Sequence, residues 1–155
     1  MSSKNKPVSS PALTATGGQE LSIEDFRGHP LVIYFYPRDN TPGCTRQGQD
    51  FRDRHDDFQA VGCAVLGVSR DSLKSHEKFA EKQGFPFPLI ADEDELLCRQ
   101  FDVIREKNMY GRKVMGIERS TFLLDAEGCI VKSWRKVRVP GHVDEVLKAA
   151  RELAG

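Results

Sequence analysis

The pattern of apolar and polar positions predicts strands that alternate with amphipathic helices. Unbroken apolar runs predict buried strands at residues 31–36, 63–69 and 87–91. Apolar residues recur at helical spacing between these runs and near the end of the chain, which predicts helices at 42–61, 71–84, 92–101 and 143–153. This order provides a sheet and the helices to cover it.

Two hairpins complete the predicted sheet. The first is expected at 13–21, and the second pairs 114–125 with 129–139 after a loop at 108–112. Strands separated by helices early in the chain, and a hairpin followed by a helix late, predict an α/β fold. Its central mixed β-sheet would be flanked by helices on both faces.

The length of the chain and its balance of charges limit the classes of function that the protein can have. At 155 residues the chain predicts one domain, at 13–155, after a flexible N-terminal segment at 1–12. Lysine plus arginine equal aspartate plus glutamate at 23 each, so no bulk charge favours nucleic acid or an anionic membrane as partner. The longest uncharged apolar run, 31–36, is too short to span a membrane, and no signal-peptide pattern follows Met1. We therefore expect a cytoplasmic protein.

One cysteine lies where a buried strand gives way to a helix. In the stretch Thr41-Pro42-Gly43-Cys44, Thr41 is expected to be the N-cap residue and Pro42 the first helical residue, which has no N–H to leave unpaired. Cys44 then falls in the first helical turn. Free N–H groups and the positive end of the helix dipole favour thiolate over thiol there. The pattern indicates a reactive cysteine rather than a packing residue.

The other cysteines and the histidines show no spacing typical of a metal site or a redox pair. No Cys-x-x-Cys occurs, and no histidine lies at ligand spacing from another histidine or from a cysteine. The pattern places Cys63 in a strand, Cys98 beside the core and Cys129 exposed just past a turn. It places His76 on a helix surface. We expect neither a metal nor a cofactor.

Two separated motifs resemble those of the peroxiredoxins. Pro37-x-x-x-Thr41-x-x-Cys44 is similar to the peroxidatic signature of that family, and the run 34–44 resembles its bacterioferritin-comigratory, or Q-type, branch. The stretch 116–122 is similar to the family's arginine strand. The resemblance implies a thioredoxin-like fold. It also implies an antioxidant, thiol-dependent peroxidase that reduces hydrogen peroxide and organic hydroperoxides.

Peroxide reduction requires charge stabilisation on both peroxide oxygens, because the attacking thiolate displaces hydroxide or alkoxide. Cys44 would be the nucleophile, and its backbone N–H, the Thr41 hydroxyl and the Arg119 guanidinium would be the donors. The resemblance implies these same roles and adds Pro37, which would shield the thiolate from water. Phenylalanine and tyrosine near the end of the strand at 31–36 suggest room for an apolar peroxide tail. The alternative is a non-catalytic thioredoxin-like binding or chaperone module, which would not need this combination of residues.

Turnover needs a second thiol, because oxidised Cys44 would be a sulfenic acid. The resemblance places the resolving cysteine of two-cysteine relatives at positions where this chain has Gln49 or Ala80. We favour a single-cysteine cycle in which thioredoxin, glutaredoxin or a small thiol attacks the sulfenic acid. Cys98 could instead resolve it if the helix unwound locally, or Cys129 could form an intersubunit bond. The Q-type branch is often monomeric, so we expect a monomer.

Overall fold

The computed structural model describes residues 6–154, apart from the side chain of Met109. Its strands are β1 Leu13–Ala15, β2 Gln19–Leu21, β3 Leu31–Phe35, β4 Ala64–Ser69, β5 Leu89–Ala91, β6 Ile104–Met109, β7 Arg112–Ile117, β8 Ser120–Leu124 and β9 Ile130–Trp134. Its helices are the 3-10 helix η1 Ile23–Phe26 and the α-helices α1 Pro42–Asp53, α2 His55–Ala60, α3 Leu73–Gln83, α4 Leu96–Gln100 and α5 His142–Ala154. Within this described part of the chain, no helix has the length and apolar content needed to cross a lipid bilayer.

Seven strands form one mixed sheet in the order β2-β1-β5-β4-β3-β8-β9. Strands β3 and β4 are parallel, as are β4 and β5, whereas β8 runs antiparallel to β3 and β9 antiparallel to β8. The central strands β3 and β4 are the two longest apolar runs of the sequence. The predicted α/β class with a central mixed sheet is confirmed.

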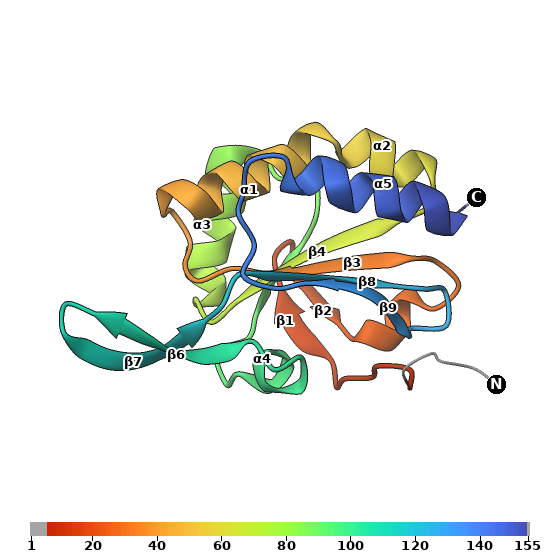
Figure 1. Ribbon diagram of the computed structural model, residues 1–155. Helices are drawn as coiled ribbons and strands as arrows, with labels where there is room; N and C mark the ends of the chain where they lie inside the picture. The colour runs from red at the N-terminus through yellow and green to blue at the C-terminus, as the bar shows by residue number, and fades with distance from the viewer. Residues whose placement is uncertain (1–5, 155) are drawn as a thin grey trace.

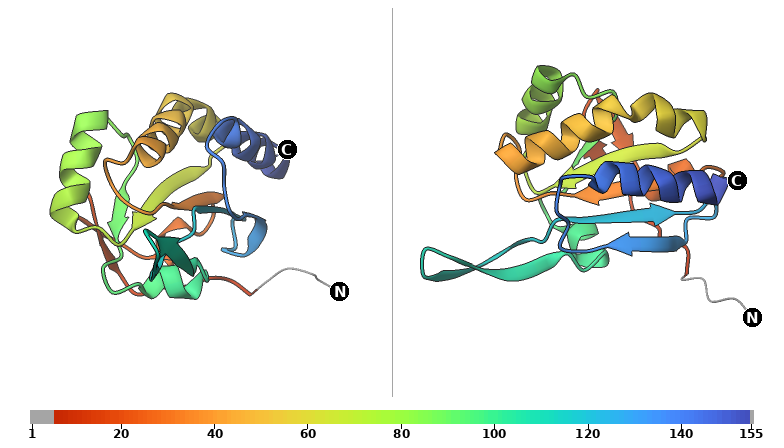
Figure 2. Two further views of the ribbon diagram at one scale, coloured as in Figure 1. Left: turned by 60° about the vertical axis from the view of Figure 1, so that its left-hand side comes forward. Right: turned by 45° about the horizontal axis from the view of Figure 1, so that its top comes forward.

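Helices cover both faces of the sheet. Helices α1, α2 and α5 lie on one face and α4 on the other, as both Figure 1 and Figure 2 show. Alternate side chains of β3 enter two separate core clusters: Tyr34 packs in the first with Phe51 of α1, and Ile33 packs in the second with Leu97 of α4. Helix α3 joins the first cluster through Phe79.

Two predicted helices have different bounds in the structure. The first long helix is divided into α1 and α2 at Arg54, whose φ of −104° and ψ of 5° leave the helical range. Helix α4 is shorter than the predicted 92–101. The buried carboxylate of Asp92 accepts hydrogen bonds from the backbone N–H groups of Leu97 and Cys98, at 3.1 and 2.8 Å, and so caps α4 from outside the helix.

The hairpin formed by β6 and β7 corrects the predicted end of the sheet. Residues 108–112 are not a plain loop, because Tyr110 and Gly111 form a tight turn with φ values of 53° and 78°. The expected pairing of 114–125 with 129–139 is wrong in its first half, since β7 pairs with β6 in a separate two-stranded sheet. Only β8 pairs with β9. Figure 1 shows the hairpin extending from the same end of the molecule as the start of α1.

Part of the predicted flexible N-terminal segment is hydrogen-bonded to the domain. The backbone N–H of Val8 donates to the carbonyl of Gly128 at 2.8 Å. The backbone N–H of Ser10 donates to the Glu24 carboxylate at 2.8 Å. These bonds hold this part of the chain against the domain, while residues 1–5 lie outside the described residues.

Candidate active site

The loop between β3 and α1 delivers Cys44 to the first turn of a helix. Thr41 has an extended backbone, with φ −83° and ψ 153°, and α1 begins at Pro42 as predicted. The first helical hydrogen bond runs from the N–H of Thr45 to the carbonyl of Thr41, at 2.8 Å. N–H groups in a first turn have no partner within their helix, so they are available to a negative charge beside Cys44.

Thr41 occupies the predicted N-cap position without making the side-chain cap. Its hydroxyl donates instead to the backbone carbonyl of Arg38, at 2.9 Å. This bond closes the loop on itself just before α1. Because the hydroxyl hydrogen is used in this way, the structure does not support the expected role of Thr41 as a donor, and the lone pairs of Oγ1 are available to accept a hydrogen bond instead.

Arg119 lies beside the Cys44 sulfur, although 75 residues separate the two in the sequence. Arg119 Nη2 is 3.4 Å from Cys44 Sγ, and Nη1 donates to Gln47 Oε1 at 2.7 Å. Arg119 belongs to the short link between β7 and β8, where its carbonyl accepts a bond from the N–H of Val137 at 3.0 Å. The close approach depends on Gly43, because a β-carbon there would lie 3.0 Å from Nη2.

Gln47 is a site residue that the sequence analysis missed. Its side chain is fully buried, and it lies three residues after Cys44, on the same face of α1. This spacing from Cys44 is the one signal that could have indicated it. In the described structure Gln47 Nε2 has no hydrogen-bond partner, so the amide contributes to the site through its oxygen, which accepts from Arg119.

A cavity of about 420 Å³ opens at Thr41, just before the start of α1, although Cys44, Gln47 and Arg119 are not among the residues that line it. It is lined by Pro37, Arg38, Thr41, Arg70 and Lys107, and by residues 114–117 of β7. One wall is therefore the loop that leads to Cys44, with Pro37 in it, and the other wall is the unexpected hairpin. The lining combines apolar side chains with cationic ones.

Lys107 of β6 is electrostatically coupled to the reacting groups. Burial lowers the pKa of Lys107 and the positive charge of Arg119 lowers it further, while negative charge on Cys44 opposes both effects. Its ammonium donates to the carbonyl of Ile117 at 2.5 Å. The hairpin thus brings a second cation close to the sulfur.

Comparisons with known proteins show the family of this chain. The AhpC/TSA family model matches residues 5–133. The peroxiredoxin Bcp of Xanthomonas campestris is 58% identical over 142 residues, which cover 92% of this chain and 89% of the relative. The chain belongs to the AhpC/TSA family. A second relative, the peroxiredoxin Bcp of Bacillus subtilis, is 45% identical over 88% of this chain and 87% of its own.

Solved structures of Q-type peroxiredoxins have the same fold. Peroxiredoxin Q of Xanthomonas campestris superposes with a TM-score of 0.90 at 56% identity, covering 94% of this chain and 92% of that one. A Xylella fastidiosa PrxQ cysteine-to-serine mutant superposes with a TM-score of 0.90 at 45% identity over the whole of both chains. The thioredoxin-like peroxiredoxin fold is therefore confirmed. The chain is a peroxidase, and the alternative of a non-catalytic binding module is not supported.

The other cysteines of this peroxiredoxin are buried away from the cavity. Cys98 belongs to the core cluster on the opposite face of the sheet from Cys44. Burial raises the pKa of Cys63 to about 12, and burial followed by the nearby Asp92 charge raises that of Cys98 still further. Cys129 is 5% exposed rather than exposed as expected, because the turn before it folds back and the Asp125 carboxylate accepts its N–H at 3.0 Å.

The aromatic residues of β3 do not form the predicted apolar pocket. Tyr34 and Tyr36 are each 1% exposed, and Tyr34 stacks on Phe51 at a ring-centroid distance of 4.5 Å. Both faces of β3 are covered, so its side chains all enter the core. The apolar wall of the cavity comes instead from Val114 and Met115 of the hairpin.

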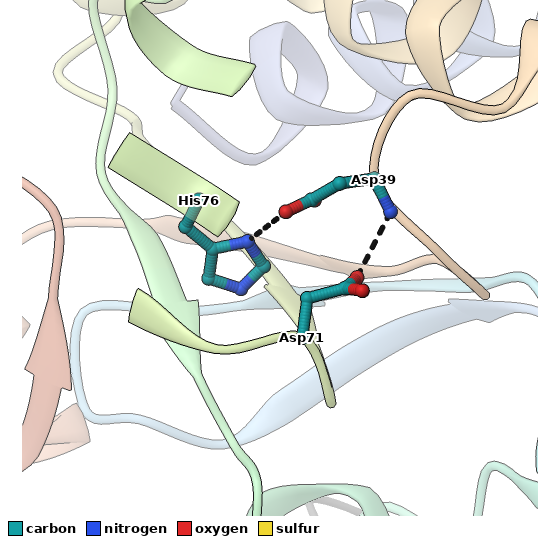
Figure 3. Close-up of side chains that lie close together, drawn as sticks. All are labelled: Asp39, Asp71 and His76. Atoms are coloured by element: carbon teal, nitrogen blue, oxygen red, sulfur yellow. Dashed lines mark hydrogen bonds and ion pairs between the residues drawn. The ribbon is translucent and has the colours of Figure 1, made fainter. Parts of the chain in front are cut away.

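The predicted surface position of His76 is also wrong. Its side chain is fully buried, and Figure 3 shows its ring pointing at the Asp39 carboxylate, with Nδ1 2.7 Å from Oδ2. His76 lies three residues before the buried Phe79 on α3. It therefore belongs to the apolar stripe of that helix. The helical spacing indicated this position, although the polar character of histidine led to the prediction of a surface residue.

Proposed function

We propose that Cys44 is the peroxidatic nucleophile of an enzyme that reduces hydrogen peroxide and organic hydroperoxides. The observation that carries this proposal is the 3.4 Å contact between Arg119 Nη2 and Cys44 Sγ at the first turn of α1. A fixed cation and free helix N–H groups stabilise a thiolate at this position. The apolar and cationic cavity beside it gives the peroxide a place to bind.

The reaction forms one sulfur–oxygen bond and breaks the peroxide O–O bond. The Cys44 thiolate attacks the nearer oxygen and becomes a sulfenic acid, while the electron pair of the O–O bond leaves with the far oxygen as hydroxide or alkoxide. That oxygen takes a proton and departs as water or alcohol. Arg119 donates to the oxygens as charge develops, and Thr41 Oγ1 accepts the O–H of the bound peroxide. Pro37 forms the wall that limits access of water.

Organic hydroperoxides fit the apolar side of the cavity. A solved structure of the Xanthomonas campestris bacterioferritin comigratory protein, 56% identical to this chain with a TM-score of 0.90, is described for its alkyl peroxide reduction activity. Val114 and Met115 would contact the alkyl group, and the loop that carries Pro37 and Thr41 would contact the peroxide end. Both parts of the substrate would then lie in one cavity.

We propose a single-cysteine cycle for the return to thiol. Gln49, at the first position where two-cysteine relatives carry a resolving thiol, instead donates from Nε2 to Gln83 Oε1 at 2.9 Å. Cys98 would have to cross to the other face of the sheet to reach Cys44. An external thiol, from thioredoxin, glutaredoxin or a small molecule, would attack the sulfenic sulfur and form a mixed disulfide with Cys44, while the sulfenic oxygen leaves as water. A second thiol would then attack the sulfur of the external thiol, which releases Cys44 as thiolate and the two external thiols as a disulfide.

The proposal includes a cytoplasmic monomer. The burial of Cys129 supports this, because an intersubunit disulfide would need that thiol at the surface. Light scattering of the reduced and oxidised protein would test it. A dimer in both states, or a Cys129 crosslink after oxidation, would contradict the monomer.

Exchange of the cysteines tests the nucleophile. Cys44→Ser should abolish peroxide consumption with each reductant. The matched control replaces Cys63, Cys98 and Cys129 together by serine, or by alanine if the serine protein is unstable, and should keep single-turnover oxidation of Cys44. Peroxidase activity retained in Cys44→Ser would refute the assignment.

Intact-mass analysis after one equivalent of peroxide tests the cycle. A dimedone adduct on Cys44 supports the single-cysteine cycle. A loss of two hydrogens with a Cys44 to Cys98 crosslink in the peptide map would instead establish Cys98 as the resolving thiol. Adding thioredoxin, glutaredoxin or a small thiol in turn would then identify the reductant.

A further inference from the structure

A buried polar cluster holds the loop that leads to Cys44. The Asp39 carboxylate, in the middle of this loop, accepts hydrogen bonds from the Tyr36 hydroxyl and the Ser75 hydroxyl, each at 2.7 Å, and meets His76 Nδ1 at 2.7 Å. The side chains of His76 and Asp39 are 0% and 1% exposed. The Asp39 backbone N–H is held as well, because it donates to the Asp71 carboxylate at 2.9 Å (Figure 3).

The partners of His76 show that the pair holds a proton. His76 Nε2 lies 3.0 Å from the carbonyl oxygen of Ile90, which can only accept, so Nε2 carries a hydrogen. At 2.7 Å, Nδ1 and the Asp39 oxygen would repel each other if both presented lone pairs. A proton must therefore lie between them. Imidazolium with carboxylate, or imidazole with carboxylic acid, gives the pair a net charge of zero.

The cluster is a hydrogen-bond network rather than a metal site. One ligand atom from each of Asp39, Asp71 and His76 lies within 4.8 Å of the other two. However, the Asp39 oxygens already accept from hydroxyl groups, and the Asp71 oxygen that faces Asp39 accepts from its N–H and from the Ser69 hydroxyl, at 2.9 and 2.5 Å. A cation would have to displace these donors. Each close contact is instead explained by a hydrogen between the two atoms.

We propose that Asp39 and His76 are a charge-neutral positioning pair for Cys44, which fixes the loop at Pro37 to Thr41 and prevents the Asp39 carboxylate from opposing the thiolate. The loop leads directly into α1, and Asp39 lies two residues before Thr41. Any displacement of Asp39 would therefore move the Thr41 hydroxyl and the first turn around the sulfur. The inference rests on the proposed role of Cys44.

Tyr34 lies within electrostatic reach of both Cys44 and Asp39. Burial raises the pKa of Tyr34, and negative charges on Cys44 and then on Asp39 raise it further, while Arg119 lowers it. Cys44 and Asp39 thus act on the same phenol from nearby positions. An unneutralised Asp39 charge would disfavour the thiolate for the same reason that it disfavours a phenolate.

Few other groups that titrate face the pair. Tyr36, the residue after β3, is a neutral phenol at neutral pH, because burial raises its pKa and the nearby Tyr34 and Asp39 raise it further. Asp71 approaches from the link between β4 and α3, and α3 contributes the uncharged Ser75. A change in the pH dependence of the His76 variants is therefore attributable to the Asp39 charge or to Asp71. A matched Asp71→Asn variant separates the two.

Nitrogen-15 NMR of the histidine side chains tests whether the pair holds the proton. In reduced protein, we expect His76 to show the pattern of a ring with hydrogens on both nitrogens or sharing one with Asp39. His76→Gln assigns the signal by its loss. A His76 spectrum typical of a neutral imidazole with a bare Nδ1 would overturn the inference.

Single-turnover oxidation of Cys44 from pH 5 to 9 tests the positioning role. His76→Leu should slow the reaction about tenfold at pH 7 and raise the pH midpoint of the rate by about one unit, because Asp39 loses its neutralising partner. Adding Asp39→Asn should return the pH midpoint to within about 0.3 unit of wild type, because no carboxylate charge is left to oppose the thiolate, whereas the rate should stay low because the loop is no longer fixed. His76→Gln, a neutral donor, replaces His76→Leu if circular dichroism shows the latter to be unfolded, and should shift the midpoint in the same direction.

Two outcomes separate this inference from the proposed function. If the His76 variant keeps the wild-type rate and pH midpoint, or if the double variant keeps the raised midpoint of the single one, the positioning pair is refuted and Cys44 remains the nucleophile. If Cys44→Ser still consumes peroxide, the proposed function fails first. Each result is read from the same stopped-flow traces with intact-mass confirmation of the oxidised residue.

Discussion

Arg119 Nη1 donates to Gln47 Oε1 at 2.7 Å, and this bond orients the guanidinium so that Nη2 lies 3.4 Å from Cys44 Sγ. The helix that presents the sulfur therefore also holds the cation that acts on it. Because both contacts come from α1, a movement of that helix would disturb the Cys44 sulfur and the Arg119 guanidinium together. The peroxidase site is thus one unit built around the first turns of α1.

Removal of the Gln47 oxygen should weaken catalysis without unfolding the protein. Gln47→Leu leaves Arg119 charged but free to turn, and loss of one hydrogen bond to a charged group, about 1.5 kcal/mol, predicts a fall in kcat/KM of roughly tenfold. Arg119→Met removes the donor itself and should cost roughly 10²-fold or more. Gln49→Leu is the matched control, because Gln49 bonds to Gln83 rather than to Arg119. Equal losses in the Gln47 and Gln49 variants would contradict this arrangement.

A methyl group at Gly43 should lower activity while leaving stability intact. Its β-carbon would lie 3.0 Å from Arg119 Nη2, so the guanidinium must shift by a few tenths of an ångström. Alanine is a better helix former than glycine by up to about 1 kcal/mol, so Gly43→Ala should unfold at the same or a higher temperature. Steady-state kinetics should show kcat/KM reduced roughly tenfold, since catalysis is sensitive to small misplacements of positioned groups.

Gly48→Ala is the control, because it should lower the stability of the protein. Gly48 is the other glycine of α1 and is buried, and a β-carbon there would overlap the ring of Phe85. Overpacking of this kind costs about 1–3 kcal/mol, which should appear as a lower urea midpoint. If Gly43→Ala lost stability and Gly48→Ala did not, the assignment of both contacts would be wrong.

The hairpin should select between peroxides. Met115 is 56% exposed and lines the cavity beside Pro37 and Thr41. Met115→Glu should reduce kcat/KM for cumene hydroperoxide roughly tenfold, because apolar burial of the substrate is worth about 1–2 kcal/mol there, and should leave hydrogen peroxide within about twofold. Val131→Glu on β9, an exposed apolar residue outside the cavity, is the control. A parallel loss for both peroxides would place the alkyl group elsewhere.

His142 should make stability depend on pH between about 4 and 6.5. Burial lowers the pKa of His142 to about 4; Glu145 opposes this shift and Arg119 adds to it. Its Nε2 lies 2.8 Å from the Thr121 hydroxyl. The unfolded chain binds a proton in this window and the folded one does not, so the free energy of unfolding is full above pH 6.5 and falls as pH drops toward 4.

Urea unfolding at pH 7 and pH 4.5 measures this effect. The wild type should lose roughly 2–3 kcal/mol more than His142→Gln over this interval, because the variant has no group to titrate there. Carboxylates shared by both proteins contribute equally and cancel in the comparison. An identical loss in the two proteins would show that His142 is not protonated on unfolding.

Short-range preferences in the sequence were enough to predict the central strands and the start of the helix that carries Cys44. The apolar runs at β3 and β4 place apolar side chains on both faces of the sheet, and both faces are covered. The order of Thr41, Pro42 and Cys44 sets the start of α1 within a few residues, because capping and the fixed φ of proline act locally. The resemblance to the peroxiredoxins then indicated Arg119 as the partner of the sulfur.

Tertiary structure alone decided which polar residues became part of the site. Gln47 reaches Arg119 across 72 positions, and His76 is buried against Asp39. The strand β6 could not be predicted from the sequence, because its residues are mostly polar and do not alternate with apolar ones. Cys98 shared the apolar pattern of the core but belongs to the far face of the sheet from Cys44. The spacing of apolar residues in a sequence indicates which residues are buried. It does not show on which face of the sheet a residue lies or which residues it contacts, because these depend on how elements distant in the sequence pack together.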